Sequence, residues 1–180
     1  MAKLILKRFQ CVIDTNELGS ESPYFLTFVG DFATGKTSLK LTRHGNWHNE
    51  VDQGETWTVN ETVADGFDLV PTKTVVLSAM VEEDEGLDVN SVEINMIRSV
   101  LTARLNTLRQ AGVTLVNATI GNLMASTMKT ALQLALSSSS GADDDYMGTR
   151  RVPITGQSGD LQLITFNADS GLYRVRYAQG

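Results

Sequence analysis

Apolar and polar residues alternate in several short segments of this chain, a pattern that is typical of half-buried β-strands. In the first segment the apolar positions include Leu4, Leu6 and Phe9. The pattern predicts strands over residues 3–14, 24–29, 37–42, 56–59 and 73–81. The last of these is among the most apolar runs in the chain, which indicates a strand in the middle of a sheet.

The period of the pattern changes in the middle of the chain. Two segments there have apolar residues at helical spacing: Val92, Met96, Ile97, Val100, Leu101, Leu105 and Leu108, and then Ile120, Leu123, Met124, Met128, Ala131, Leu132 and Ala135. Asn90 or Ser91 can cap the first helix, and Gly112 can end it. We therefore expect a helical hairpin over about 89–138, with its apolar stripes, methionines included, packed on each other or on a sheet.

From Arg151 onward the period returns to two, and we expect strands in residues 152–155, 161–166 and 172–177. Predicted strands thus flank a predicted helical pair. The fold class that follows is mainly β: an antiparallel β-sandwich with an inserted α-helical hairpin. A chain of 180 residues is long enough for one well-buried core and short for two, so we expect residues 1–180 to form a single domain.

Residues 30–38, GDFATGKTS, match the phosphate-loop pattern G-x-x-x-x-G-K-S/T through Gly30, Gly35, Lys36 and Thr37. A phosphate loop must be followed at once by a helix whose N-terminus faces the phosphates. Here the period-two pattern of a strand follows instead. We therefore interpret the segment as a hairpin loop with Lys36 as a solvated charge, and nucleotide binding is a remote alternative.

Net charge, cysteine content and the absence of certain motifs exclude further classes of function. Lys and Arg total 15 against 21 Asp and Glu, a net charge of −6, which disfavours nonspecific binding to nucleic acid or to anionic lipid without metal ions. Cys11 is the single cysteine, and we expect it to be a core residue because it lies within a predicted strand. The chain has no nucleophile elbow G-x-S-x-G, and we expect no enzymatic activity. It also has no signal-peptide pattern, so we expect a soluble protein, cytoplasmic as synthesised.

Carboxylates are concentrated in three connections that leave or enter predicted strands. The three groups are Asp14, Glu17 and Glu21, then Glu82 to Glu85, then Asp143 to Asp145. Gathering so many anions costs free energy unless cations compensate. Calcium takes about six to eight oxygen ligands in a flexible shell, whereas magnesium tends to keep its waters. One acidic run is usually a solvated surface, but three runs favour a calcium site.

The segment IDTNELGSESPYFLTFVG resembles the first calcium loop and following strand of the C-two domain, a calcium-dependent phospholipid-binding β-sandwich. Gly19, Pro23 and Tyr24 stand at the positions of that family's Gly-x-Ser-Asp-Pro-Tyr pattern. VEEDEG and DDDYMG resemble the two sides of its last calcium loop, with the helical pair inserted between them. The sequence is also similar to a group of uncharacterised microbial proteins with comparable acidic segments.

The acidic segments and the resemblance together give the candidate calcium ligands Asp14, Glu17, Glu21, Glu82, Asp84, Asp144 and Asp145. Ser22 stands where the family has a ligand, so the first loop departs from the family pattern. The resemblance implies that bound calcium bridges to anionic phospholipid, and a carboxylate of a protein partner is the other target that we consider. The alternative is a structural or assembly protein, such as a homo-oligomer, that uses the helical hairpin as its interface.

Overall fold

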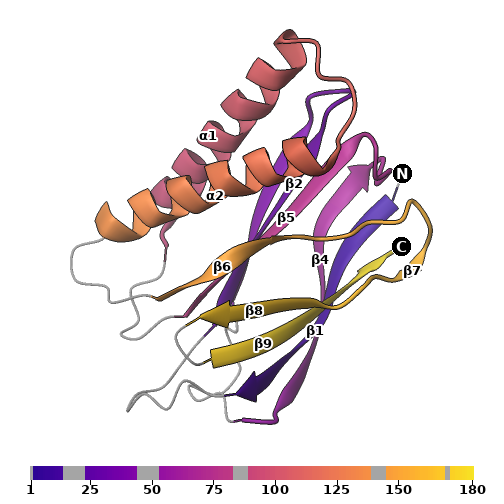
Figure 1. Cartoon of the computed structure of the whole chain (residues 1–180). Coiled ribbons are helices and arrows are strands. Elements are labelled where there is room, and N and C mark those ends of the chain that lie inside the picture. The colour runs from indigo at the N-terminus through magenta and orange to yellow at the C-terminus, as the bar shows by residue number, and fades with distance from the viewer. Residues whose placement is uncertain (1, 14–22, 44–52, 83–88, 139–144, 169–170) are drawn as a thin grey trace.

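The chain is mainly β and has two helices (Figure 1). The structure is a computed structural model that describes residues 2–13, 23–43, 53–82, 89–138, 145–168 and 171–180. Its strands form two antiparallel sheets. The predicted fold class, an antiparallel β-sandwich with an inserted helical hairpin, is confirmed.

One sheet, which we name sheet A, contains both ends of the described chain. Its strands are β4 (Thr56–Phe67), β1 (Ala2–Ile13), β9 (Gly171–Gln179) and the short β7 (Gly159–Asp160), in that order, and β8 (Ile164–Ala168) also pairs with β9. The second sheet, sheet B, has the order β3 (Thr37–Arg43), β2 (Tyr24–Asp31), β5 (Thr74–Glu82) and β6 (Asp145–Arg151).

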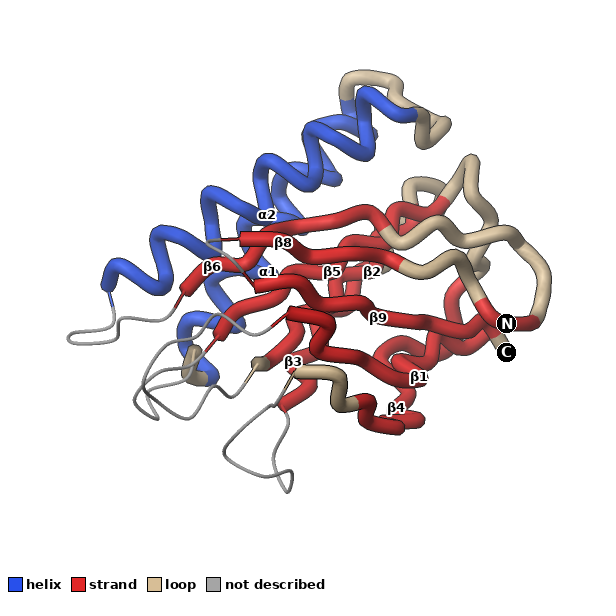
Figure 2. The backbone as a smooth tube through the Cα atoms, turned by 60° about the horizontal axis from the view of Figure 1, so that its bottom comes forward, coloured by secondary structure: helices blue, strands red, loops and turns tan. Residues whose placement is uncertain are grey.

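The helices α1 (Ser91–Gln110) and α2 (Ala118–Ser138) lie between β5 and β6 in the chain and pack on the outer face of sheet B. Figure 2 shows both helices on the same side of the strands. Asn90 caps α1 as predicted: its side chain accepts hydrogen bonds from the backbone N–H groups of Val92 and Glu93. The Glu93 carboxylate accepts one in return from the Asn90 N–H, at 2.8 Å, which completes a capping box.

Sheet B is the middle of three layers and therefore has an apolar core on each face. Phe25 and Met80 contribute to the core between the two sheets, while Phe28 and Leu77 contribute to the core under the helices. Every residue of β2 and β5 is buried as a result. The continuous apolar run of β5 follows from this position, since a strand covered on both faces has no solvent-facing residues. Its predicted place in the middle of a sheet is confirmed.

One strand prediction near the C-terminus is wrong, and another strand there was not predicted. Residues 152–155 form no strand, although Val152 and Ile154 are buried as their alternation predicts. Pro153 has no N–H, so the pairing with β5 ends at Val152, whose N–H still donates to the Val76 carbonyl at 2.9 Å. The chain then leaves sheet B for sheet A. The polar segment β6, which the alternation did not predict, is the strand that pairs with β5.

Of the other strands, β4 and β8 depart most from their predicted bounds. β4 extends to Phe67 rather than ending at Val59, because Asn60 has a φ of +53° beside a register shift and so interrupts the alternation. β8 begins only at Ile164, three residues after the predicted start.

Candidate functional site

The phosphate-loop pattern belongs to the turn between β2 and β3, and no helix follows it. The Asp31 carboxylate accepts hydrogen bonds from the Ala33 N–H at 2.7 Å, the Thr34 N–H at 3.3 Å and the Thr34 hydroxyl at 2.8 Å. The Asp31 carboxylate thus accepts hydrogen bonds from backbone N–H groups of the kind that a bound phosphate would need. The hairpin-loop interpretation of this segment is confirmed.

Both glycines of the pattern are explained by the docking of α1. A Cβ atom on Gly30 would lie 2.5 Å from Cδ1 of Leu105, so a larger residue here would require the Leu105 side chain or the helix to shift. Gly35 has a φ of +79°, and the Arg109 guanidinium lies against it. Arg109 also donates to the Phe32 carbonyl at 2.9 Å and ties the end of α1 to the turn. The pattern therefore serves packing in this protein.

Lys36 has a structural role that the sequence did not reveal. Its side chain is exposed, but the ammonium group donates to the carbonyls of Gly66 at 2.9 Å and Asp65 at 3.3 Å. The Nζ atom also lies 4.4 Å from the centroid of the Phe67 ring. The solvated-charge prediction is therefore corrected: Lys36 joins the start of β3 in sheet B to the end of β4 in sheet A.

Most of the predicted calcium ligands lie outside the described residues: Asp14, Glu17, Glu21, Asp84 and Asp144. Asp145 is described only as the first backbone position of β6. Glu82, the last residue of β5, is the one candidate whose side-chain environment the structure describes.

Glu82 is 3% exposed, and its Oε1 atom accepts a hydrogen bond of 3.1 Å from the Tyr173 hydroxyl. Tyr173 belongs to β9, so this bond joins the two sheets. Glu82 and Asp145 are direct partners in the β5–β6 register. Like charges directly opposite each other destabilise an antiparallel pair unless a counter-charge is present. The register thus brings together two acidic residues that are 63 positions apart in the chain.

The strand ends that border the three acidic connections lie at one end of the sandwich. In sheet B, Tyr24 pairs with Val81 and Glu82 pairs with Asp145, so the start of β2, the end of β5 and the start of β6 meet there. In sheet A, Ile13 at the end of β1 pairs with Leu172 at the start of β9. The bond between Tyr173 and Glu82 joins these two ends, which lie toward the lower left of Figure 1.

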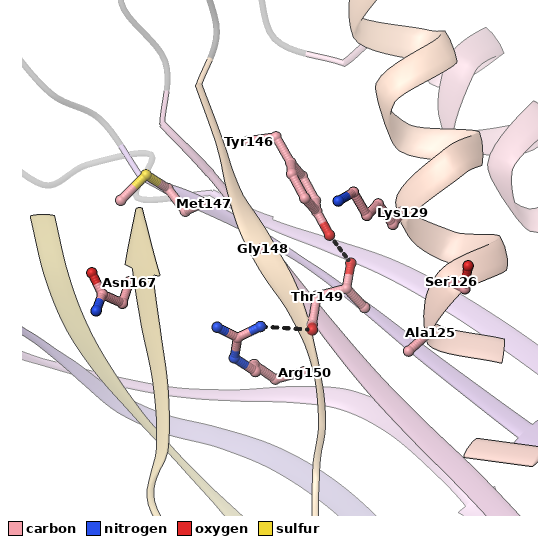
Figure 3. A pocket seen from close by; sticks show the side chains of 9 residues that line it. All are labelled: Ala125, Ser126, Lys129, Tyr146, Met147, Gly148, Thr149, Arg150 and Asn167. Atoms are coloured by element: carbon pink, nitrogen blue, oxygen red, sulfur yellow. Dashed lines mark hydrogen bonds between the residues drawn. The ribbon is translucent and has the colours of Figure 1, made fainter. Parts of the chain in front are cut away.

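A pocket of about 400 Å³ lies beside β6, between α2 and β8 (Figure 3). We name it the β6 pocket; its polar side chains are Ser126, Lys129, Tyr146, Thr149, Arg150 and Asn167. Sequence reasoning did not find it, because its two cations come from different elements separated by the acidic connection before β6. No residue spacing in the sequence indicates that they meet.

Comparisons with known proteins do not identify a family for this chain: no protein-family model, no curated protein and no solved structure matches it. Within the described ranges, no three or more His, Cys, Asp or Glu residues are grouped as metal ligands would be. Neither α1 nor α2 has the length and apolar character needed to cross a membrane.

Proposed function

We propose that the protein is a non-enzymatic calcium-binding module whose site lies at the end of the sandwich bordered by Ile13, Tyr24, Glu82 and Asp145. The supporting observation is the convergence of these four residues, because each of them borders an acidic connection. Calcium needs more oxygen ligands than one short connection supplies. Three connections that each border this end of the sandwich offer more carboxylates than one connection alone.

Glu82 has the environment expected of an oriented ligand at the edge of such a site. Its carboxylate is nearly inaccessible to water and is fixed at one oxygen by the Tyr173 hydroxyl. Carboxylates that bind metals are commonly oriented by a hydrogen bond of this kind.

Thermal unfolding with calcium and with a chelator tests this proposal. A cation that binds only the folded protein at 100 times its Kd adds about 2.7 kcal/mol, or roughly 5–10 °C in Tm for a chain of this size. We expect Glu82→Gln, which keeps an acceptor for Tyr173, and Asp145→Asn to reduce this shift. Asp65→Asn is the matched control, since Asp65 pairs with Lys3 at the opposite end of β1. A Tm that is the same in saturating calcium and in chelator would refute the proposal.

The second part of the proposal concerns the molecule that the calcium-bound protein binds. The C-two resemblance favours anionic phospholipid, with calcium bridging the acidic end to the headgroups. Sedimentation with vesicles that contain phosphatidylserine tests this step, and we expect binding with calcium that the chelator reverses. Calcium-dependent stabilisation without vesicle binding would direct the search to a protein partner instead.

The assembly alternative has less support from the helical hairpin. The apolar stripes of both helices are already buried against sheet B and against each other, including Ile97, Leu101, Met124 and Met128. The large apolar side chains exposed on the helices are Val92, Val100 and Leu134. Sizing at several protein concentrations tests this alternative directly.

A further inference from the structure

The β6 pocket has a charge opposite to that of the chain as a whole. The protein carries a net charge of −6, yet the two charged residues that line the pocket are the cations Lys129 and Arg150. Figure 3 shows Lys129 coming from α2, Arg150 from β6 and Asn167 from β8. Since β6 is the last strand of sheet B, a ligand along its outer edge can contact side chains from both of its faces.

Arg150 is held in place by two backbone carbonyls and retains donors for a ligand. Its Nε donates to the Thr165 carbonyl on β8 at 3.0 Å, and its Nη1 donates to the Thr149 carbonyl at 3.2 Å. A guanidinium has five N–H donors, so these two bonds fix its plane and leave other donors unused. Arg150 is thus oriented before any ligand arrives.

The other side of the pocket also offers donors. The Tyr146 hydroxyl donates to Thr149 Oγ1 at 2.7 Å, which leaves the Thr149 hydroxyl free to donate its own hydrogen (Figure 3). Burial raises the pKa of Tyr146, and so keeps its phenol protonated as the donor of this bond. The Lys129 ammonium lies 5.8 Å from the centroid of the Tyr146 ring, and no carboxylate among the described residues forms a salt bridge with it.

We propose that the β6 pocket binds a phosphate monoester, with Lys129 and Arg150 contacting the phosphate and the hydroxyls of Thr149 and Ser126 completing its hydrogen bonds. A phosphate monoester near pH 7 carries up to two negative charges on three terminal oxygens. Two cations and two hydroxyl groups match that charge and acceptor number. A carboxylate has one charge and two oxygens, and a single arginine fork satisfies it.

The rest of the pocket suits a small organic substituent on the phosphate. Ala125, Met147 and the Tyr146 ring supply apolar surface, and Asn167 supplies an amide for a polar group. Gly148, with a φ of +129°, places no side chain between Tyr146 and Arg150. A volume of about 400 Å³ lies within the usual range for small-molecule sites. The phosphate can belong to a free metabolite or to a lipid headgroup.

Calorimetric titration of the whole protein with glycerol 3-phosphate tests this inference, with inorganic phosphate and succinate as comparison ligands. All titrations are made in chelator, so that the result is independent of the calcium proposal. We expect glycerol 3-phosphate to bind more tightly than succinate. Amide NMR shifts on adding the ligand should be concentrated in residues 125–129 and 146–150.

Lys129→Gln and Arg150→Gln should each weaken binding about tenfold or more, because each removes a charge-assisted hydrogen bond. Arg8→Gln is the matched control: Arg8 is an exposed cation on β1, in the other sheet. Arg150 also joins β6 to β8, so Lys129→Gln, which removes no bond between strands, keeps the test valid if Arg150→Gln fails to fold.

Three results would overturn the proposal: no binding at millimolar glycerol 3-phosphate, tighter binding of succinate, or equal weakening by Arg8→Gln. Vesicles separate the two sources of the phosphate. Calcium-independent binding to phosphatidic acid vesicles that is lost in Lys129→Gln, without binding to phosphatidylcholine vesicles, would support the phosphate assignment and give it a lipid source. Binding of glycerol 3-phosphate without vesicle binding would support a soluble ligand.

Discussion

Tyr177 is the residue whose alteration tests the packing of the two sheets most sharply. Its hydroxyl lies in the core between the sheets, 2.9 Å from Thr27 Oγ1 and 2.8 Å from Ser78 Oγ. All three side chains are buried, and Thr27 and Ser78 are direct partners in the β2–β5 register. The Tyr177→Phe change removes the one oxygen through which sheet A contacts this polar pair.

The cost of Tyr177→Phe follows from the bonds that are lost. Two buried hydrogen bonds contribute about 0.5–1.5 kcal/mol each, and a buried hydroxyl left without a partner costs about 1–3 kcal/mol. Because Thr27 and Ser78 lie opposite each other, their hydroxyls can bond together in the variant and recover part of this cost. We therefore expect Tyr177→Phe to lower the free energy of unfolding by about 2 kcal/mol.

Urea denaturation, monitored by circular dichroism, measures this change through the transition midpoint at constant m-value. The triple variant Tyr177→Phe, Thr27→Val, Ser78→Ala is the decisive comparison. Replacing all partners of a buried polar group by apolar ones removes the penalty of unsatisfied hydroxyls. The triple variant should therefore be at least as stable as Tyr177→Phe. A loss below about 0.5 kcal/mol in the single variant, or a less stable triple variant, would refute this reasoning.

Four further results are expected. Burial raises the pKa of Tyr177 to about 12 from the ordinary 10.0, so the protonated phenol stabilises the fold below pH 10 and this contribution is lost as the pH rises toward 12. Urea midpoints from pH 9 to 11.5 should fall more steeply in the wild type than in Tyr177→Phe, and equal slopes would contradict this. Gly30→Ala should cost about 1–3 kcal/mol in urea melts through its contact with Leu105, and a loss within 0.5 kcal/mol would exclude the proposed close approach. Asn90→Ala should cost about 1 kcal/mol in the same assay and Asn90→Asp much less, whereas equal losses would argue against the cap. Lys36→Ala should reduce stability by roughly 0.5–1 kcal/mol, and Mg–ATP should not bind the wild type; ATP binding that this variant abolishes would restore the phosphate-loop interpretation.

The fold could be predicted where residue patterns are local. The helical stripes of α1 and α2 and the alternation in β1 and β3 identified those elements because one face of each meets a core. β6 could not be predicted in this way. Its sequence DYMGTRR is polar, and it is a strand because β5 offers it an edge to pair with. Pairing with β5 therefore determines the strand conformation of this segment, whose own residues favour it only weakly.

The candidate sites show the same division between local and tertiary information. The acidic connections are visible in the sequence, and the structure adds that the residues bordering them meet at one end. The roles of Lys36 and Gly30 depend on partners 29 or more positions away, so the local pattern suggested a nucleotide loop instead. The β6 pocket needs α2, β6 and β8 to be assembled before its cations meet.

Paramagnetic NMR with a lanthanide ion in place of calcium tests the central hypothesis most directly, because the ion broadens the amide signals nearest to it. We expect one equivalent of ion to broaden the amides of Ile13, Tyr24, Glu82 and Asp145 together, and to leave that of Gly66, at the opposite end of the sandwich, sharp. Excess calcium should reverse the effect. Broadening confined to a single strand end, or no broadening at all, would contradict a calcium site formed jointly by the three acidic connections.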